Sequence, residues 1–367
     1  MALDRIRLGD FRNHPATGLD GTARFNLLVG PNGAGKTNVL EALSLFAPGR
    51  GLRRARLEAM VRSGAANGFT IGADLVSGTT PVRLGTAMRP DAPSRRVVLA
   101  SGAPLPAARL AEWLSLSWLT PAMDRLFADS ASARRRFLDR MVLALLPAHA
   151  VAASAYERAM RERNLVLGRE GSTGKAADPH WLDALERLMA EAGAAVAESR
   201  AAIVTRLNER LAGLPDAPFA RPLLAIETGD PATDAAAFAE GWRRTRSRDR
   251  AAGRTLSGPH RDDLAVTMAG TGRAAAECST GEQKALLIAI TLAHAELAAG
   301  TRPLVLLLDE VAAHLDPLRR EALFARLAAS GAQIWMTGTE PEPFAAIAGT
   351  AAVWHLSEGS TKKRERE

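Results

Sequence analysis

Apolar and polar positions alternate near the start of the chain and predict short strands at Ile6–Phe11 and Phe25–Val29. The second strand runs into a glycine-rich loop, Gly30–Thr37, and the residues Thr37–Phe46 that follow have helical spacing. The local order is therefore strand, loop, helix. A phosphate-binding loop requires this order, because it passes from the end of a strand to the start of a helix.

A region of glycine, proline and β-branched residues comes next, from about residue 64 to residue 104. It predicts a small β subdomain with strands at Phe69–Leu75 and Val97–Ala100. From about residue 107 to residue 252 the chain is instead rich in alanine, leucine and arginine at helical spacing. The middle of the chain is therefore expected to be a helical lobe.

The helical lobe is predicted to contain helices at Ser132–Leu146 and Val151–Leu167, followed by a glycine-rich break at Gly168–Gly174. Helices of this length cannot form a long coiled-coil arm. The clearest helix follows the break and places one apolar stripe toward a core. The residues of this stripe are Leu182, Leu185, Met189, Val196, Ile203, Leu207 and Leu211.

Strand patterns return in the last third of the chain. A strand is expected at Leu264–Met268, a helix at Gln283–Ala299, and a further strand in the segment Gln333–Thr339. The apolar run Leu304–Leu308 is typical of a buried parallel strand. The predicted organisation is thus α/β, then helical, then α/β again.

The composition is that of a soluble globular protein, with 47% hydrophobic and 24% charged residues in a chain of 367. No apolar run reaches bilayer length, and the first residues lack a signal peptide, so we expect a cytoplasmic protein. The single cysteine, Cys278, is expected to be a small buried residue. The net charge of +7 favours a polyanionic partner such as nucleic acid, although coding bias toward arginine also gives such a charge.

The glycine-rich loop carries the clearest chemistry. Its glycines allow backbone N–H groups to surround phosphates, Lys36 would reach the β- and γ-phosphates, and the Thr37 hydroxyl would bind Mg²⁺. The alternative is an ordinary glycine turn before a helix. The candidate ATP-binding residues are Gly30, Pro31, Asn32, Gly33, Ala34, Gly35, Lys36 and Thr37.

Two acidic residues follow the apolar strand Leu304–Leu308. Asp309 would hold Mg²⁺ at the carboxyl end of this strand, and Glu310 would act as the general base that activates the attacking water. The alternative is a strand that ends in two solvated acids. The phosphate-binding loop in the same chain favours the catalytic interpretation, with Glu310 and Lys36 as catalytic residues.

The segment Ser279-Thr-Gly281-Glu-Gln283 resembles the signature motif of ABC-type ATPases. The resemblance implies that Ser279 and Gly281 bind the γ-phosphate held by a second subunit, where a helix N-terminus completes the anion site. Without it, Ser279 would be a helix cap and nothing more. Leu315-Asp316 resembles the D-loop of these proteins, while Thr337 and Thr339 occupy the region of their switch histidine. No glutamine is assigned to the loop that usually completes magnesium coordination.

Three further motifs narrow the resemblance to the RecF family of DNA repair proteins. They are Leu8-Gly-Asp-Phe11-Arg12-Asn13, Arg134-Arg-Arg-Phe-Leu-Asp139 and Gly258-Pro-His260-Arg261-Asp262-Asp263. The resemblance implies an ABC-type ATPase head, lobe I, formed by residues 1–106 and 253–367, with an inserted helical lobe II at 107–252. It also places Arg12 and Asn13 near the nucleotide. By themselves, the arginines of the second motif fit a solvated helix face, and the third motif fits a turn capped by Asp262.

The family resemblance implies an ATP-gated DNA clamp in recombinational repair of single-strand gaps and stalled replication. ATP would close a head-to-tail homodimer and weak, DNA-stimulated hydrolysis would open it. RecO and RecR would be partners, with support for RecA loading and the SOS response. DNA would be contacted at its phosphate backbone by a basic segment that contains Arg243, Arg244, Arg246, Arg248 and Arg250. Aromatic residues for stacking on single strands are sparse there, and Trp242 is the exception. The candidate DNA-binding residues are Arg134, Arg135, Arg246 and Arg248.

Three alternatives remain at this point. A transporter ATPase subunit shares the phosphate loop, signature and acidic pair, but a large helical insertion and arginine clusters argue against it. The second is an inactive nucleotide-binding scaffold. The third is a P-loop nuclease of the overcoming-lysogenization type, although little chain follows Thr339 to form its acidic nuclease domain.

Overall fold

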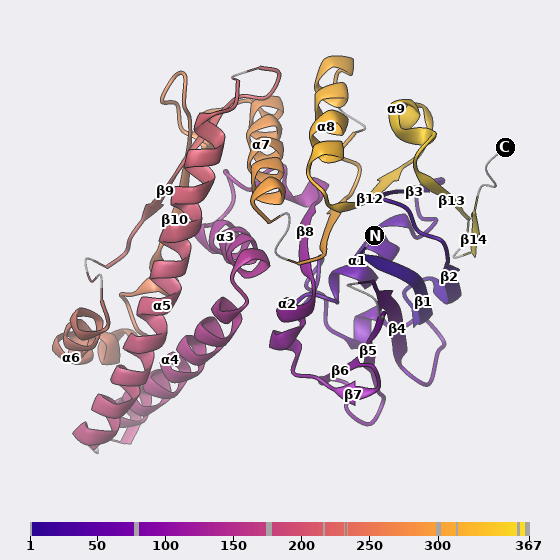
Figure 1. Ribbon diagram of the computed structural model, residues 1–367. Helices are drawn as coiled ribbons and strands as arrows, with labels where there is room; N and C mark the ends of the chain where they lie inside the picture. Colours follow the sequence, from indigo (N-terminus) through magenta and orange to yellow (C-terminus); the bar gives the residue numbers. More distant parts are fainter. Residues whose placement is uncertain are drawn as a thin grey trace. The chain divides into compact units, whose positions relative to one another are not determined.

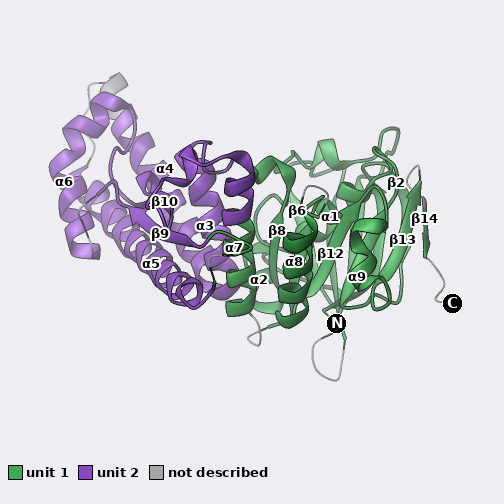
Figure 2. Ribbon diagram, turned by 90° about the horizontal axis from the view of Figure 1, so that it is seen from above, with its two compact units in different colours: residues 1–124, 215–220, 287–367 green, residues 125–214, 221–286 purple. Residues whose placement is uncertain are grey.

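The computed structural model describes residues 2–76, 81–173, 178–215, 217–230, 232, 234–298, 302–312, 315–357 and 360–363. The chain divides into two compact units (Figure 2). Unit 1 contains Met1–Asp124, Pro215–Ala220 and Leu287–Glu367, and unit 2 contains Arg125–Leu214 and Arg221–Leu286. Residues 253–286, which were expected in the ATPase lobe, belong to unit 2.

The first sheet of unit 1 is mainly parallel, and its strand order is β14-β13-β3-β12-β11-β8. β3 lies between β12 and β13 and is parallel to both, while only β14 runs antiparallel to its neighbour. The strand β11, between β12 and β8, reads Leu-Val-Leu-Leu-Leu and is buried throughout, as expected for a parallel strand covered on both faces. The strands are β3 (Phe25–Val29), β8 (Ser115–Leu119), β11 (Leu304–Leu308), β12 (Gln333–Gly338), β13 (Ala352–Ser357) and β14 (Ser360–Lys363).

The second sheet of unit 1 is antiparallel, with the order β2-β1-β4-β5-β6-β7. Buried and more exposed positions alternate along β5 and along the second half of β2, which is the pattern of a sheet with one covered face. This sheet confirms the predicted β subdomain. The strands are β1 (Leu3–Phe11), β2 (His14–Leu19), β4 (Phe69–Leu75), β5 (Val82–Met88), β6 (Arg96–Ala100) and β7 (Ala103–Pro104).

One apolar core joins both sheets of unit 1. Phe11 and Phe69 from the antiparallel sheet, Leu40 from helix α1, and Leu307 and Trp335 from the parallel sheet belong to the same buried cluster. Burial of these apolar side chains holds α1 between its neighbours. The phosphate-binding loop, which leads into α1, is held in place with it. The helices that lie wholly in unit 1 are α1 (Lys36–Ser44), α2 (Leu110–Trp113), α8 (Pro317–Ala329) and α9 (Ala345–Ala348) (Figure 1).

Unit 2 is mainly helical, with one antiparallel strand pair. Its own apolar core includes Tyr156, Met189 and Trp242. All seven residues of the predicted stripe on the long helix are buried, which confirms that helix. The elements are α3 (Ala131–Leu145), α4 (Ala148–Thr173), α5 (Pro179–Ala212), α6 (Ala235–Ala252), β9 (Pro222–Glu227) and β10 (Asp263–Met268), and α7 (Thr280–Ala298) begins in this unit.

Two details of the predicted organisation are wrong. The region 107–252 is not helical throughout, because it contains β8 of the parallel sheet and β9 of unit 2. β8 pairs with β11 over its whole length, and this pairing outweighs the weak strand propensity of its serines and leucines. The glycine-rich segment does not end α4 at Gly168, since the helix continues to Thr173. The last residue of that predicted break, Gly174, lies outside the described residues.

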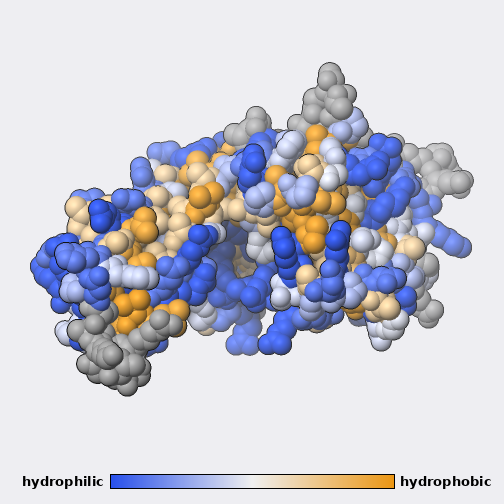
Figure 3. All heavy atoms as spheres, turned by 90° about the horizontal axis from the view of Figure 1, so that it is seen from below, coloured by the Kyte–Doolittle hydropathy of each residue, from blue (hydrophilic) through white to orange (hydrophobic). Residues whose placement is uncertain are grey.

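The surface is mixed. Figure 3 shows one face on which hydrophilic and hydrophobic residues are interspersed. None of the helices in the described part of the chain is long and apolar enough to cross a membrane. The large apolar side chains with the greatest exposure are Val151, Leu165, Trp181, Leu188, Leu223 and Leu318.

Candidate nucleotide-binding site

The carboxyl ends of three parallel strands meet at one edge of the first sheet. Val29, the last residue of β3, pairs with Gly338, and Leu308, the last residue of β11, pairs with Met336. The Gly30 N–H donates to the Gly338 carbonyl at 3.3 Å. The register therefore brings the phosphate loop, the acidic pair and the end of β12 together, where open parallel sheets bind their ligands.

Two glycines of the loop have no room for a side chain. Gly35 has φ 101°, and a Cβ there would lie 2.6 Å from Asn13 Oδ1 and 2.7 Å from His14 Nε2. At Gly30 a Cβ would collide with the Leu356 carbonyl oxygen. The backbone path of the loop thus requires glycine at both ends, and this supports the phosphate-loop interpretation over an ordinary turn.

Lys36 lies inside the site rather than in solvent. Its Nζ donates to the carbonyl oxygens of Gly30 at 2.6 Å and Pro31 at 2.9 Å. Burial lowers the pKa of Lys36, while the carboxylates of Glu310 and Asp309 oppose that shift. The predicted phosphate-binding ammonium and the acidic pair are therefore close enough to interact.

Thr37 and Asp309, the two predicted magnesium ligands, are in direct contact. The Thr37 hydroxyl donates to Asp309 Oδ1 at 2.9 Å across 272 positions of sequence. The Thr337 hydroxyl donates to the same oxygen at 2.7 Å. Hydroxyl and carboxylate oxygens are the ligands that Mg²⁺ prefers, so this donor set fits the ion.

Glu310 follows with an unusual backbone, φ 53°, in the left-handed region. Its N–H donates to the Thr337 hydroxyl at 2.9 Å, which holds it in that conformation. Sequence reasoning identified Thr337 only as the residue in place of a switch histidine. Its contact with both acids was missed, because no local pattern joins the end of β12 to the end of β11.

The turn between β1 and β2 lies against the loop. Asn13 Nδ2 donates to the Gly33 carbonyl at 3.4 Å. Arg12 instead binds the first helix: its guanidinium makes two hydrogen bonds with Glu41, of 2.8 and 2.7 Å. Asn38 Nδ2 also donates to Asn13 Oδ1 at 2.7 Å. Asn13 thus contacts the phosphate loop itself, whereas Arg12 contacts the helix that follows it.

The signature segment lies in unit 2, at the start of α7. The Ser279 N–H and hydroxyl both donate to Glu282 Oε2, at 2.8 and 2.9 Å, and the Glu282 N–H returns a bond of 3.3 Å to Ser279 Oγ. This is a capping box, and the Ser279 N–H lowers the pKa of the Glu282 carboxyl. Ser279 and Gly281 are exposed, so a second molecule can approach them. Cys278 beside them is buried, as predicted.

Two motifs of the family resemblance pair with each other inside unit 2. The Arg134 guanidinium binds the Asp263 carboxylate through bonds of 2.8 and 2.6 Å. Arg135 donates to the Asp262 carbonyl at 2.5 Å. Arg200 then joins Asp139 to Asp262 through bonds of 2.7 and 3.2 Å. These contacts fix α3 against the segment that precedes β10.

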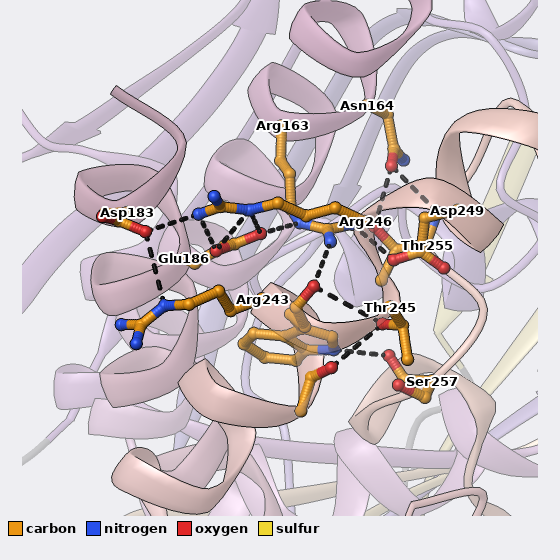
Figure 4. Close-up of polar contacts among 12 residues, drawn as sticks. Arg163, Asn164, Asp183, Glu186, Arg243, Thr245, Arg246, Asp249, Thr255 and Ser257 are labelled. Carbon is orange, nitrogen blue, oxygen red and sulfur yellow. Dashed lines mark hydrogen bonds and ion pairs between the residues drawn. The ribbon is translucent and has the colours of Figure 1, made fainter. Parts of the chain in front are cut away.

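Arg246 belongs to a buried polar network (Figure 4). It binds Glu186 and Asp183, with bonds of 2.5 and 2.6 Å from Nη2. Arg163 is fully buried beside it and pairs with Glu186 at 3.0 Å and Asp249 at 2.7 Å. Arg248, two residues along α6 from Arg246, is exposed instead. The two predicted DNA-binding residues of this helix therefore have different surroundings.

This arrangement, with a phosphate loop after β3, an acidic pair after β11 of the same parallel sheet and a helical insertion, defines an ABC-type P-loop ATPase head. Residues 25–74 match the family described as "AAA domain, putative AbiEii toxin, Type IV TA system". The fold is also that of a solved structure, "Structure of the recombination mediator protein RecF-ATP in RecFOR pathway". The TM-score is 0.86 at 20% identity, over 99% of this chain and 98% of that one.

Relatives identify the family. The chain is 47% identical over 374 residues to the DNA replication and repair protein RecF of Agrobacterium fabrum, and 44% identical over 380 residues to that of Rhizobium leguminosarum bv. trifolii. Each alignment covers 98% of both proteins. The chain belongs to the RecF family of DNA replication and repair proteins. This confirms the resemblance, and the alternative of a transporter subunit is wrong.

Proposed function

We propose that this chain is an ATP-gated DNA clamp that acts in recombinational repair of single-strand gaps. The observation that carries the proposal is the meeting of Thr37 and Asp309 at 2.9 Å, beside Lys36 and Glu310. It joins a phosphate-binding loop to a magnesium ligand and a general base. As in the family resemblance, RecO and RecR are the proposed partners, with RecA loading and SOS induction as the outcome in the cytoplasm.

Each residue of the site would have its own role in ATP hydrolysis. Thr37 and Asp309 would hold the magnesium ion, and Lys36 would bind the β- and γ-phosphates. Glu310 would accept a proton from the attacking water. Bound Mg-ATP supplies the transferable phosphoryl group. The Asp309 carboxylate is held in place by the hydroxyls of Thr37 and Thr337, whereas the Lys36 ammonium would exchange the carbonyls of Gly30 and Pro31 for phosphate oxygens.

A second copy of the chain would complete the site. Ser279 and Gly281 are exposed at the start of α7, where helix N–H groups attract an anion. A head-to-tail homodimer would place this end of one copy against the γ-phosphate held by the other. Closure would then depend on ATP, and slow hydrolysis, stimulated by DNA, would open the dimer.

The DNA contact of unit 2 is proposed to involve the exposed Arg248 on α6. Arg134, Arg135 and Arg246 hold bonds within unit 2, so a role in positioning the basic surface suits them better than direct contact with phosphates. Recognition would use the DNA backbone rather than base edges.

The experiment that tests the function uses Glu310→Gln, with sedimentation in the presence and absence of ATP. We expect a dimer with ATP, a monomer without it, and retention of gapped duplex DNA by the dimer. A monomer under both conditions, at saturating protein, would refute the clamp. Loss of ATP turnover in Glu310→Gln with ATP binding retained would exclude the inactive scaffold.

A further inference from the structure

His14 is a buried histidine that lies against the phosphate-binding loop and is not among its candidate residues. It is the first residue of β2 and is fully buried. Phe11 pairs with His14 across the turn Arg12-Asn13, so His14 directly follows the residue that contacts the Gly33 carbonyl. One tight hairpin therefore brings two successive side chains to the loop.

The His14 ring joins β2 to the end of the loop. Its Nε2 lies 3.1 Å from the Gly35 carbonyl oxygen, and its Nδ1 lies 2.9 Å from the Thr17 hydroxyl oxygen. A carbonyl oxygen only accepts hydrogen bonds, so Nε2 carries the hydrogen and donates to Gly35. Nδ1 then accepts from the Thr17 hydroxyl. The two contacts fix the tautomer and the orientation of the ring.

Gly35 is the junction between the loop and α1. Its backbone is left-handed, with φ 101° and ψ 6°, and it makes no side-chain hydrogen bond to the first turn of the helix. An ordinary N-cap side chain would occupy one of the first N–H groups of α1, and a phosphate needs those groups. The bond from His14 reaches the carbonyl side of the junction instead. It stabilises the junction and uses none of the N–H groups of the first turn.

The bond from His14 also bears on the direction of a backbone N–H group. The Gly35 carbonyl accepts the Val39 N–H at 3.1 Å as well as the His14 ring, so it points along α1. The Gly35 carbonyl and the Lys36 N–H belong to one planar trans peptide, in which the two groups point in opposite directions. The Lys36 N–H therefore points out of the N-terminus of α1, where a phosphate binds.

We propose that His14 is a positioning residue of the nucleotide site. It holds the Gly35–Lys36 peptide in the orientation that binds the β-phosphate of ATP, and it acts through the Gly35 carbonyl rather than by touching the nucleotide. The inference rests on the proposed function, because it takes Gly30–Thr37 as the ATP-binding loop. It assigns a role in that site to a buried side chain of the antiparallel sheet.

The test compares two amide variants. In His14→Gln the amide nitrogen can take the place of Nε2 and donate to the Gly35 carbonyl. In His14→Asn the side chain is one methylene shorter and reaches only the place of Nδ1. Isothermal titration calorimetry of the full chain with Mg-ATP, and separately with Mg-ADP, measures the Kd. Both nucleotides are used because both carry the β-phosphate.

We expect His14→Asn to raise the Kd of both nucleotides roughly two- to tenfold, the effect of one hydrogen bond. His14→Gln should stay close to the wild type. In His14→Asn the KM for ATP should rise with the Kd, whereas kcat at saturating ATP should stay near the wild-type value, because Asp309 and Glu310 keep their contacts with Thr337.

A second variant and a control separate this role from a general loosening of unit 1. Thr17→Val removes the donor to Nδ1 and should raise the Kd in the same direction, so it decides the question if His14→Asn does not fold. Thr22→Val is the control. Thr22 is buried and donates to the Leu3 carbonyl at 2.8 Å, and the Gln333 side chain at the start of β12 donates to it at 3.2 Å. This variant should lower the melting temperature without nucleotide and leave the Kd unchanged.

Three results would overturn the inference. They are a wild-type Kd in both His14→Asn and Thr17→Val, an equal rise in His14→Asn and His14→Gln, and a rise in Thr22→Val as large as that in His14→Asn. If the wild-type protein binds neither nucleotide, the proposed function itself fails. If the wild type binds both and any of the three results is found, the function stands and only the role of His14 is excluded.

Discussion

Thr337 and Asp309 are joined by a hydrogen bond of 2.7 Å from the threonine hydroxyl to carboxylate Oδ1. The same hydroxyl accepts the N–H of Glu310 at 2.9 Å. One buried side chain at the end of β12 therefore orients both acids at the end of β11. A histidine is not needed there to position the acidic pair.

Replacing Thr337 with valine should slow hydrolysis while ATP binding is kept. Loss of a hydrogen bond to a buried charged partner costs about 1–3 kcal/mol. If that cost falls on the transition state, turnover drops roughly five- to 150-fold, since about 1.4 kcal/mol corresponds to a factor of ten. Steady-state ATPase assays measure the effect. Thr337→Ser retains the hydroxyl and should recover most of the activity; equal loss in both variants would contradict the assigned role.

Replacing Ser279 with aspartate separates helix capping from a role in the dimer. Aspartate is a good N-cap, but it loses the hydroxyl bond to Glu282 and places a second carboxylate beside it, so the melting temperature should fall modestly while the fold is kept. A negative charge facing the γ-phosphate of a second subunit should, however, abolish ATP-dependent dimerisation. Sedimentation of Ser279→Asp in the Glu310→Gln background tests this. An ATP-dependent dimer of normal affinity would show that the start of α7 does not meet the phosphate.

Replacing Arg163 with methionine should destabilise unit 2 strongly. The change leaves the buried carboxylates of Glu186 and Asp249 without this partner, and breaking such a pair costs about 3–5 kcal/mol. Arg243→Ala is the control, since its pairs with Asp183 and Glu240 are exposed and worth less than about 1 kcal/mol. Urea unfolding measures both. Similar losses in the two variants would show that the network of Figure 4 does not stabilise unit 2.

Arg246 and Arg248 should respond differently to replacement by glutamine. Arg248→Gln should reduce the salt slope of DNA binding by about 1 without changing thermal stability. Arg246→Gln should lower the melting temperature, because Glu186 and Asp183 lose their shared partner. Anisotropy titrations and thermal melting distinguish the two effects. A change in salt slope for Arg246 alone would reverse the assignment.

The stability of unit 2 should fall on mild acidification because of His260. Its Nε2 lies 3.1 Å from the Thr255 carbonyl and therefore carries the hydrogen, while the Tyr156 hydroxyl donates to Nδ1 at 2.7 Å. Burial lowers the pKa of His260 below 6.5, with a contribution from Arg261 and Arg135. The unfolded chain then binds the proton more readily, so stability is complete above pH 6.5 and declines as the pH falls toward the lowered pKa.

Thermal melting between about pH 5 and 8 measures this dependence against the ordinary histidine pKa. Glutamine does not titrate in this pH range. The melting temperature of His260→Gln should therefore be lower than that of the wild type at neutral pH, and it should change less as the pH is varied. A variant whose pH dependence parallels that of the wild type would assign the acid sensitivity to groups other than His260.

Local patterns predicted several strands of unit 1 with good accuracy, including the two that lead into the phosphate loop and the acidic pair. The bounds of Phe25–Val29, Phe69–Leu75 and Leu304–Leu308 agree with the structure residue by residue. β8 was missed, because its strand character comes from pairing with β11 and not from its own residues. β9 was missed in the same way, since it pairs with β10 over six positions.

The sequence by itself determined the phosphate loop and the acidic pair. Both depend on neighbouring residues, since glycine backbone freedom and a buried strand end are local properties. Only the tertiary structure decided the partners of the charged side chains. Arg134 meets Asp263 across 129 positions, and Arg246 meets Glu186 across 60. The ion pairs of a long side chain depend on which carboxylates the fold brings near it. The sequence of a basic segment therefore does not show which of its arginines are paired and which are exposed.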